Sequence, residues 1–64
     1  MAVNKDFAND LLHEIRILLL DVQDAIDYME SEDYEQAETY CRIIADRGAN
    51  VDDLRRKTFI DEDE

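Results

Sequence analysis

The chain has 64 residues and a formal net charge of -11, from 18 acidic and 7 basic side chains. This length allows a single small domain, and the charge argues against direct binding to a nucleic-acid backbone or an anionic membrane surface. One cysteine rules out an intrachain disulfide, and one histidine leaves no cluster with zinc-ligand spacing. Because proline is absent and glycine occurs once, β-sandwiches and barrels are disfavoured, and we expect an all-α fold.

The first predicted helix spans residues 5–30, with Asn4 or Asp6 as its N-cap. Its apolar residues recur at alternating steps of three and four, which is the spacing of a heptad seam. The predicted seam consists of Ala8, Leu11, Ile15, Leu18, Val22, Ala25 and Met29, and it is widened by Leu12, Leu19 and Ile26. A stripe of this width is typical of a helix in a globular bundle.

A polar break separates this helix from a second, shorter helix that we expect over residues 34–47. Asp33 is the predicted N-cap, Gln36 completes a capping-box-like pair, and Gly48 is a natural residue to end the helix. The apolar residues predicted to line one side of this helix are Tyr34, Ala37, Cys41 and Ile44. We expect Cys41 to be a reduced core residue.

A third, short helix is predicted over residues 51–60, with Asn50 as its N-cap. Two aspartates in its first turn and three basic residues near its end complement the helix dipole. Residues 1–60 would then form one helical domain, and the acidic residues 61–64 a disordered tail.

The predicted helix lengths favour self-association. At 1.5 Å per residue, the first helix is about 37 Å long and the second about 21 Å, so an antiparallel neighbour covers only part of the first helix. We therefore expect a homodimer, a four-helix-like bundle, with a three-helix monomer and obligate docking on another protein as alternatives. The predicted dimer interface consists of Phe7, Leu11, Leu12, Ile15, Leu18, Leu19 and Val22.

A second surface is expected to meet a protein partner. Ile17 and Leu20 lie off the main stripe, and acidic residues stand at intervals of three or four around them. The predicted partner-binding residues are Asp10, Glu14, Ile17, Leu20, Asp21, Asp24 and Asp27. Negative charge would steer the encounter with a partner that has a basic surface.

The sequence favours a non-enzymatic function without a cofactor or a metal ion. Paired carboxylates catalyse only in a pocket that separates their pKa values, and acids at helical spacing without a loop glycine do not resemble a calcium site. The leading hypothesis is a protein-binding module, an inhibitor or a regulatory adaptor. The alternatives are an acidic inhibitor of viral or plasmid type that mimics nucleic-acid charge to block a DNA-binding protein, and a structural subunit of a larger helical assembly.

Acidic side chains interrupt the first 20 residues, which argues against a secretory signal. The longest apolar run, residues 17–20, is far too short for a membrane span. We therefore expect a soluble, cytoplasmic protein.

Overall fold

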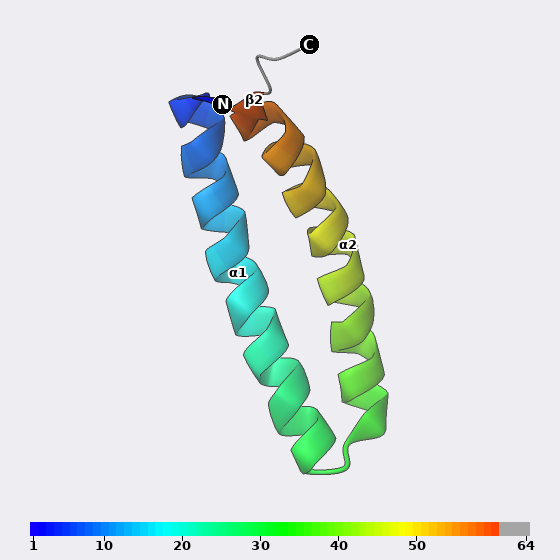
Figure 1. Ribbon diagram of the computed structural model, residues 1–64. Coiled ribbons are helices and arrows are strands. Elements are labelled where there is room, and N and C mark those ends of the chain that lie inside the picture. Colours follow the sequence, from blue (N-terminus) through cyan, green and yellow to red (C-terminus); the bar gives the residue numbers. More distant parts are fainter. Residues whose placement is uncertain (61–64) are drawn as a thin grey trace.

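The computed structural model describes residues 1–60, so the predicted acidic tail at residues 61–64 lies outside the described residues. Helices α1 (Lys5–Glu30) and α2 (Tyr34–Thr58) run antiparallel, side by side, as one elongated hairpin (Figure 1). Two short strands, β1 (Ala2–Val3) and β2 (Phe59–Ile60), pair antiparallel at the end opposite the loop. The predicted all-helical hairpin is thus confirmed.

Local sequence signals set the start of each helix and the turn between them. The Asn4 side chain accepts hydrogen bonds from the amides of Asp6 and Phe7, which confirms Asn4 as the N-cap of α1. The Asp33 side chain accepts from the Gln36 amide in the same way at α2. Glu32, between the helices, has a φ of 62°, a left-handed conformation that lets the chain reverse direction within three residues.

The predicted third helix is wrong, because α2 continues without interruption through Gly48 and Asn50 to Thr58. Gly48 has an ordinary helical backbone, not the left-handed conformation that ends a helix. An internal glycine costs about 1 kcal/mol relative to alanine. Continuing the helix places Val51 and Leu54 partly out of solvent against α1, and this burial outweighs the cost of the glycine.

The length argument for self-association is therefore also wrong. The helices contain 26 and 25 residues, and α2 covers α1 over its whole length. Leu11, which was predicted to lie in the dimer interface, is 7% exposed, and Phe7 is half-buried with its ring 5.7 Å from the Lys57 ammonium.

The seam between the helices differs from the predicted one. On α1 the inward positions are occupied by Phe7, Leu11, Glu14, Leu18, Asp21, Ala25 and Tyr28. On α2 they are occupied by Ala37, Tyr40, Ile44, Arg47, Val51, Leu54 and Thr58. Leu11, Leu18 and Ala25 belong to the predicted seam, but Ile15 and Met29 are turned away from α2.

The termini close the open end of the hairpin. Val3 pairs with Phe59, and the Asn4 amide donates a 2.8 Å hydrogen bond to the Thr58 carbonyl. The Thr58 side chain is fully buried beneath this closure, and among residues 1–60 its hydroxyl has no hydrogen-bond partner.

Candidate interaction surface

A row of apolar side chains on α1 faces away from α2. Five large residues remain between 45% and 55% exposed, namely Leu12, Ile15, Leu19, Ile26 and Met29. Each stands one position after a residue of the inward seam, as Leu12 stands after Leu11. A helix turns by about 100° per residue, so these positions form a second apolar stripe beside the seam.

The same flank of α2 continues the apolar surface with smaller side chains. Cys41, Ala45 and Gly48 each stand one position after a seam residue of α2. Corresponding positions of two antiparallel helices lie on the same side of the pair, because a two-fold axis perpendicular to the pair relates the helices. Tyr34, which is 58% exposed, extends this row toward the loop.

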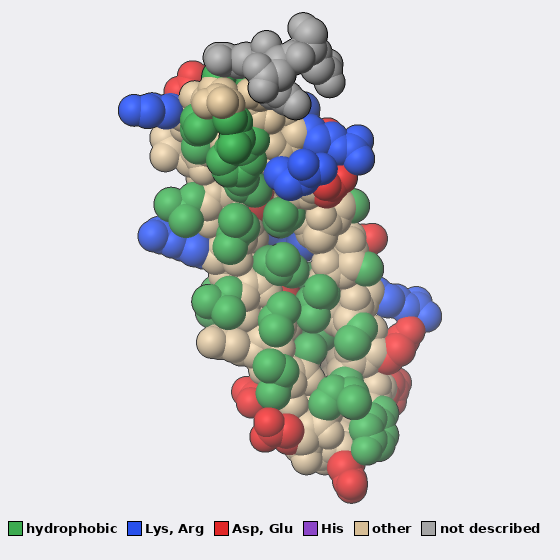
Figure 2. Space-filling model, viewed as in Figure 1, with side chains coloured by type: hydrophobic (Ala, Val, Ile, Leu, Met, Phe, Trp, Pro, Cys, Tyr) green, Lys and Arg blue, Asp and Glu red, His purple; other side chains and the backbone are tan. Residues whose placement is uncertain are grey.

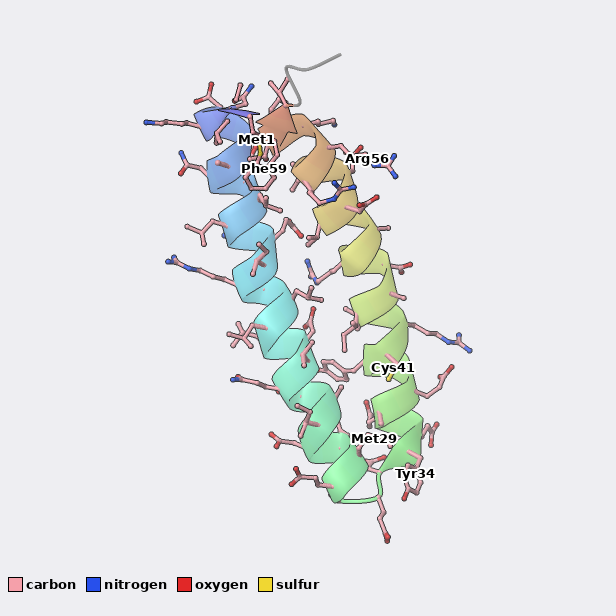
Figure 3. All side chains as sticks on the ribbon, viewed as in Figure 1. Met1, Met29, Tyr34, Cys41, Arg56 and Phe59 are labelled. Carbon is pink, nitrogen blue, oxygen red and sulfur yellow. The ribbon has the colours of Figure 1, made fainter. Side chains whose placement is uncertain are left out.

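Together these residues form what we call the apolar face: Leu12, Ile15, Leu19, Ile26 and Met29 of α1, and Tyr34, Cys41, Ala45 and Gly48 of α2. Figure 2 shows hydrophobic side chains along the length of the hairpin on this side, over both helices. Figure 3 places Met29 beside Tyr34 near the loop, with Cys41 farther along α2. Charged side chains lie mainly at the edges of this view.

Cys41 is exposed, so its expected place in the core is wrong. Tyr40 takes the inward position instead, and its ring lies against that of Tyr28 with 5.4 Å between the centroids. This packing rotates Cys41 onto the apolar face. The pKa of Tyr40 is raised, first by the negative charge of Asp24 and then by its neighbour Tyr28 and by burial.

The structure divides the predicted dimer interface between two surfaces. Phe7, Leu11 and Leu18 pack into the seam with α2, and Val22 is half-buried at its margin. Leu12, Ile15 and Leu19 lie on the apolar face, where a second molecule can reach them. The predicted seam and the residues that widen it included all of these positions except Phe7, but the sequence did not show that they form two stripes facing different surfaces.

The predicted partner-binding residues are divided as well. Asp10, Leu20, Asp24 and Asp27 are exposed, and Ile17 is half-buried among them. These residues lie on the side of α1 opposite the apolar face, and we call them the acidic flank: Asp10, Ile17, Leu20, Asp24 and Asp27. Glu14 and Asp21 do not belong to this flank, because they are turned into the seam.

Glu14 and Asp21 flank one arginine in the middle of the hairpin. The Arg47 Nε lies 2.7 Å from Oδ2 of Asp21, and Nη1 lies 3.6 Å from Oε2 of Glu14. The N–H of Nε is not aligned for a hydrogen bond to Asp21, so the contact is an ion pair with poor hydrogen-bond geometry. Sequence reasoning placed Arg47 at a helix end and missed this cluster. The signal was present, because Glu14 and Asp21 are seven residues apart at one heptad position.

The basic residues near the end of α2 pair with acids of the same helix. Arg55 and Arg56 both contact Asp52, and Lys57 contacts Asp53 at 2.9 Å. The hydrogen bond from Arg55 is the main reason why the pKa of Asp52 lies below its usual value. All these side chains are at least about half exposed, so the pairs add little stability.

No protein-family model, curated protein or solved structure is detectably similar to this chain. Within residues 1–60, no three acidic, histidine or cysteine side chains gather as they would around a metal ion. Neither described helix is both long enough and apolar enough to cross a membrane.

Proposed function

We propose that the protein is a small, acidic, non-enzymatic protein-binding module that acts as a homodimer, either as an inhibitor or as a regulatory adaptor. The observation that carries this proposal is the apolar face, which extends along the hairpin and has no partner within residues 1–60.

The proposal is supported by how little the isolated hairpin buries. Among residues 1–60 the buried apolar residues are Leu11, Ala25 and Ala37, and two of these are alanines. A domain of about 60 residues is marginally stable even with a well-filled core, and such chains commonly gain stability from a second subunit. Covering the apolar face would supply the core that the hairpin lacks.

The expected gain is similar in magnitude to the cost of forming a dimer. Complete burial of a leucine, isoleucine or methionine side chain contributes about 1.5–3 kcal/mol, and roughly half of that remains available at each of the five large residues. Two copies together would gain on the order of 10 kcal/mol. This gain is comparable to the estimated cost of association, about 4–15 kcal/mol, and exposed flanking residues add to it.

The acidic flank is the proposed surface for a different protein. It lies opposite the apolar face and stays accessible in a dimer that uses that face. Ile17 and Leu20 provide apolar contact area, and the surrounding aspartates would attract a basic partner. Imitation of a nucleic-acid backbone is less well supported, because Glu14 and Asp21 pair with Arg47 and interrupt the row of acids.

Two neighbouring leucines provide the test. Leu19 is 55% exposed on the apolar face, and Leu20 is 61% exposed on the acidic flank. Leu19→Glu should halve the mass measured by sedimentation equilibrium, because a dimer would bury the new charge. Leu20→Glu is the matched control and should leave the mass of the dimer unchanged.

A monomeric wild-type protein at concentrations of tens of micromolar would contradict the homodimer. Dissociation by Leu20→Glu, with Leu19→Glu still dimeric, would show that the opposite flank forms the interface. A much larger discrete mass for the wild type would instead support the structural-subunit alternative, in which the apolar face binds helices of several chains.

A further inference from the structure

The two ends of the hairpin differ in charge. Four of the seven basic residues lie at the end with the termini, namely Lys5, Arg55, Arg56 and Lys57, and within residues 1–60 they are balanced there by Asp6, Asp10, Asp52 and Asp53. The loop end carries an excess of acids. Between positions 24 and 42 the only basic residue is Arg42, whereas the acidic residues are Asp24, Asp27, Glu30, Glu32, Asp33, Glu35 and Glu38. In a symmetric dimer, each loop end lies either beside the loop end of the partner or beside the partner's termini.

A second copy can cover the apolar face in two symmetric ways. With the two-fold axis along the hairpin, both loops lie at the same end and α1 of one copy packs on α2 of the other. With the axis across the hairpin, each loop lies over the partner's termini, α1 packs on α1, and α2 packs on α2.

The apolar face itself discriminates between these arrangements. On α1 the row is apolar from Leu12 to Met29, whereas the same flank of α2 carries Glu38, Asp52 and Arg55. Packing α1 on α2 would press leucine and isoleucine side chains against these charged groups and remove them from water, which is costly. Packing α1 on α1 joins apolar side chains to apolar side chains and leaves the charged groups between the two α2 helices.

Charge complementarity points the same way. The contacts of Arg47 with Glu14 and Asp21 place the middle of α2 level with residues 14–21 of α1, so an axis across the hairpin passes near Leu19 and Ala45. Such an axis places each acidic loop end beside the less acidic terminal end of the partner, and it also sets Glu38 of one copy opposite Asp52 of the other. Loops at the same end would instead superpose the two acidic ends, and each close like-charge pair costs about 1–4 kcal/mol.

We propose that a second copy of this chain docks on the apolar face in the antiparallel orientation, with α1 on α1, α2 on α2, and each loop beside the partner's termini. This inference rests on the homodimer proposed above and adds its orientation. Leu12, Leu19 and Ile26 are evenly spaced, so the axis at Leu19 places Leu12 of one copy opposite Ile26 of the other. The small residues Cys41, Ala45 and Gly48 lie where the two α2 helices approach each other.

Single cysteines in a Cys41→Ser background test the orientation, with a short bis-maleimide as the cross-linker. Leu19→Cys should give an adduct of twice the 7.5 kDa chain mass on a denaturing gel, and so should Ala45→Cys. A refolded mixture of the two variants should give no Leu19→Cys to Ala45→Cys adduct, because these positions lie diagonally across the bundle.

A second pair of cysteine variants keeps the test valid if Leu19→Cys itself prevents dimerisation. Leu12→Cys and Ile26→Cys should each stay monomeric on the gel when treated alone, and should form the mixed adduct when refolded together. Each variant is first shown to have the mass of a dimer before cross-linking.

The cross-linking results distinguish a wrong orientation from the absence of a homodimer. A predominant Leu19→Cys to Ala45→Cys adduct would overturn the antiparallel orientation while leaving the homodimer intact. The absence of every expected adduct in a protein of dimer mass would do the same. A wild-type protein with the mass of a monomer would overturn both.

Discussion

Thr58 and Arg47 are polar residues at inward positions of a seam that is otherwise largely apolar. Arg47 separates two carboxylates that would repel one another without it. Because two acids face one guanidinium and the closest contact is poorly aligned, we expect this cluster to specify how the helices pair more than to stabilise them. Thr58 is buried at the point where the termini close the hairpin, and its carbonyl, not its hydroxyl, takes part in that closure.

Thr58→Val should raise the free energy of unfolding by about 1 kcal/mol, because it replaces a buried hydroxyl that has no partner among the described residues with a methyl group of similar size. Urea denaturation followed by circular dichroism measures this change. Thr58→Ser is the control, and it should destabilise the protein because it keeps the hydroxyl and removes the methyl group. A less stable Thr58→Val protein would show that the hydroxyl is hydrogen-bonded in solution.

At the scale of elements, α2 shows how packing overrides a local stop signal. Gly48 followed by Asn50 is the pattern of a helix that ends and a helix that begins. Both residues are nevertheless helical, because the chain beyond them gains burial against α1 and several ion pairs three or four residues apart. The result is a second helix as long as the first, and a hairpin with both faces accessible along its whole length.

Gly48→Ala distinguishes the continuous helix from the interrupted one. Apart from the neighbouring residues and the local backbone of α2, no atom lies within 4 Å of the position that a Cβ at residue 48 would take, so alanine should raise the free energy of unfolding by about 0.5–1 kcal/mol. Thermal unfolding of the two proteins, compared at a concentration where both are monomeric so that the proposed contact between α2 helices does not contribute, provides the measurement. Destabilisation would indicate a left-handed glycine and a helix that ends at residue 47.

The whole molecule presents two long faces of different character. The apolar face is suited to another surface of the same kind, and the acidic flank to a basic one. Both proposed contacts would form on a molecule whose net charge is -11, so long-range electrostatics oppose the first and favour the second.

Salt should therefore affect the two contacts in opposite directions. An increase from about 0.05 to 0.5 M sodium chloride should tighten the homodimer, because the mutual repulsion of two acidic chains is screened. The same increase should weaken binding of a basic peptide to the acidic flank. Analytical ultracentrifugation and fluorescence anisotropy would measure the two constants, with Asp24→Asn as a variant that reduces only the second. A homodimer that weakens as salt is added would count against an apolar interface.

The hydrophobic spacing and the cap residues were sufficient to predict an all-helical hairpin, the bounds of α1 and the start of α2. These features depend on interactions within a few residues, such as the Asn4 and Asp33 caps, which a linear sequence displays directly. The exposed acids and Leu20 on one side of α1 were predictable for the same reason, because helical periodicity alone relates their positions.

Only the tertiary structure decided which of two apolar stripes on α1 meets α2. Residues such as Leu11 and Leu12 are adjacent and equally apolar, so periodicity ranks them alike, and the choice depends on the side chains that α2 offers opposite them. The same is true of the inward turn of Glu14 and Asp21, which requires Arg47 from a distant part of the chain, and of the helix through Gly48, which requires burial against α1. The spacing of residues within one segment does not predict the free energy of contacts that this segment makes with a distant one.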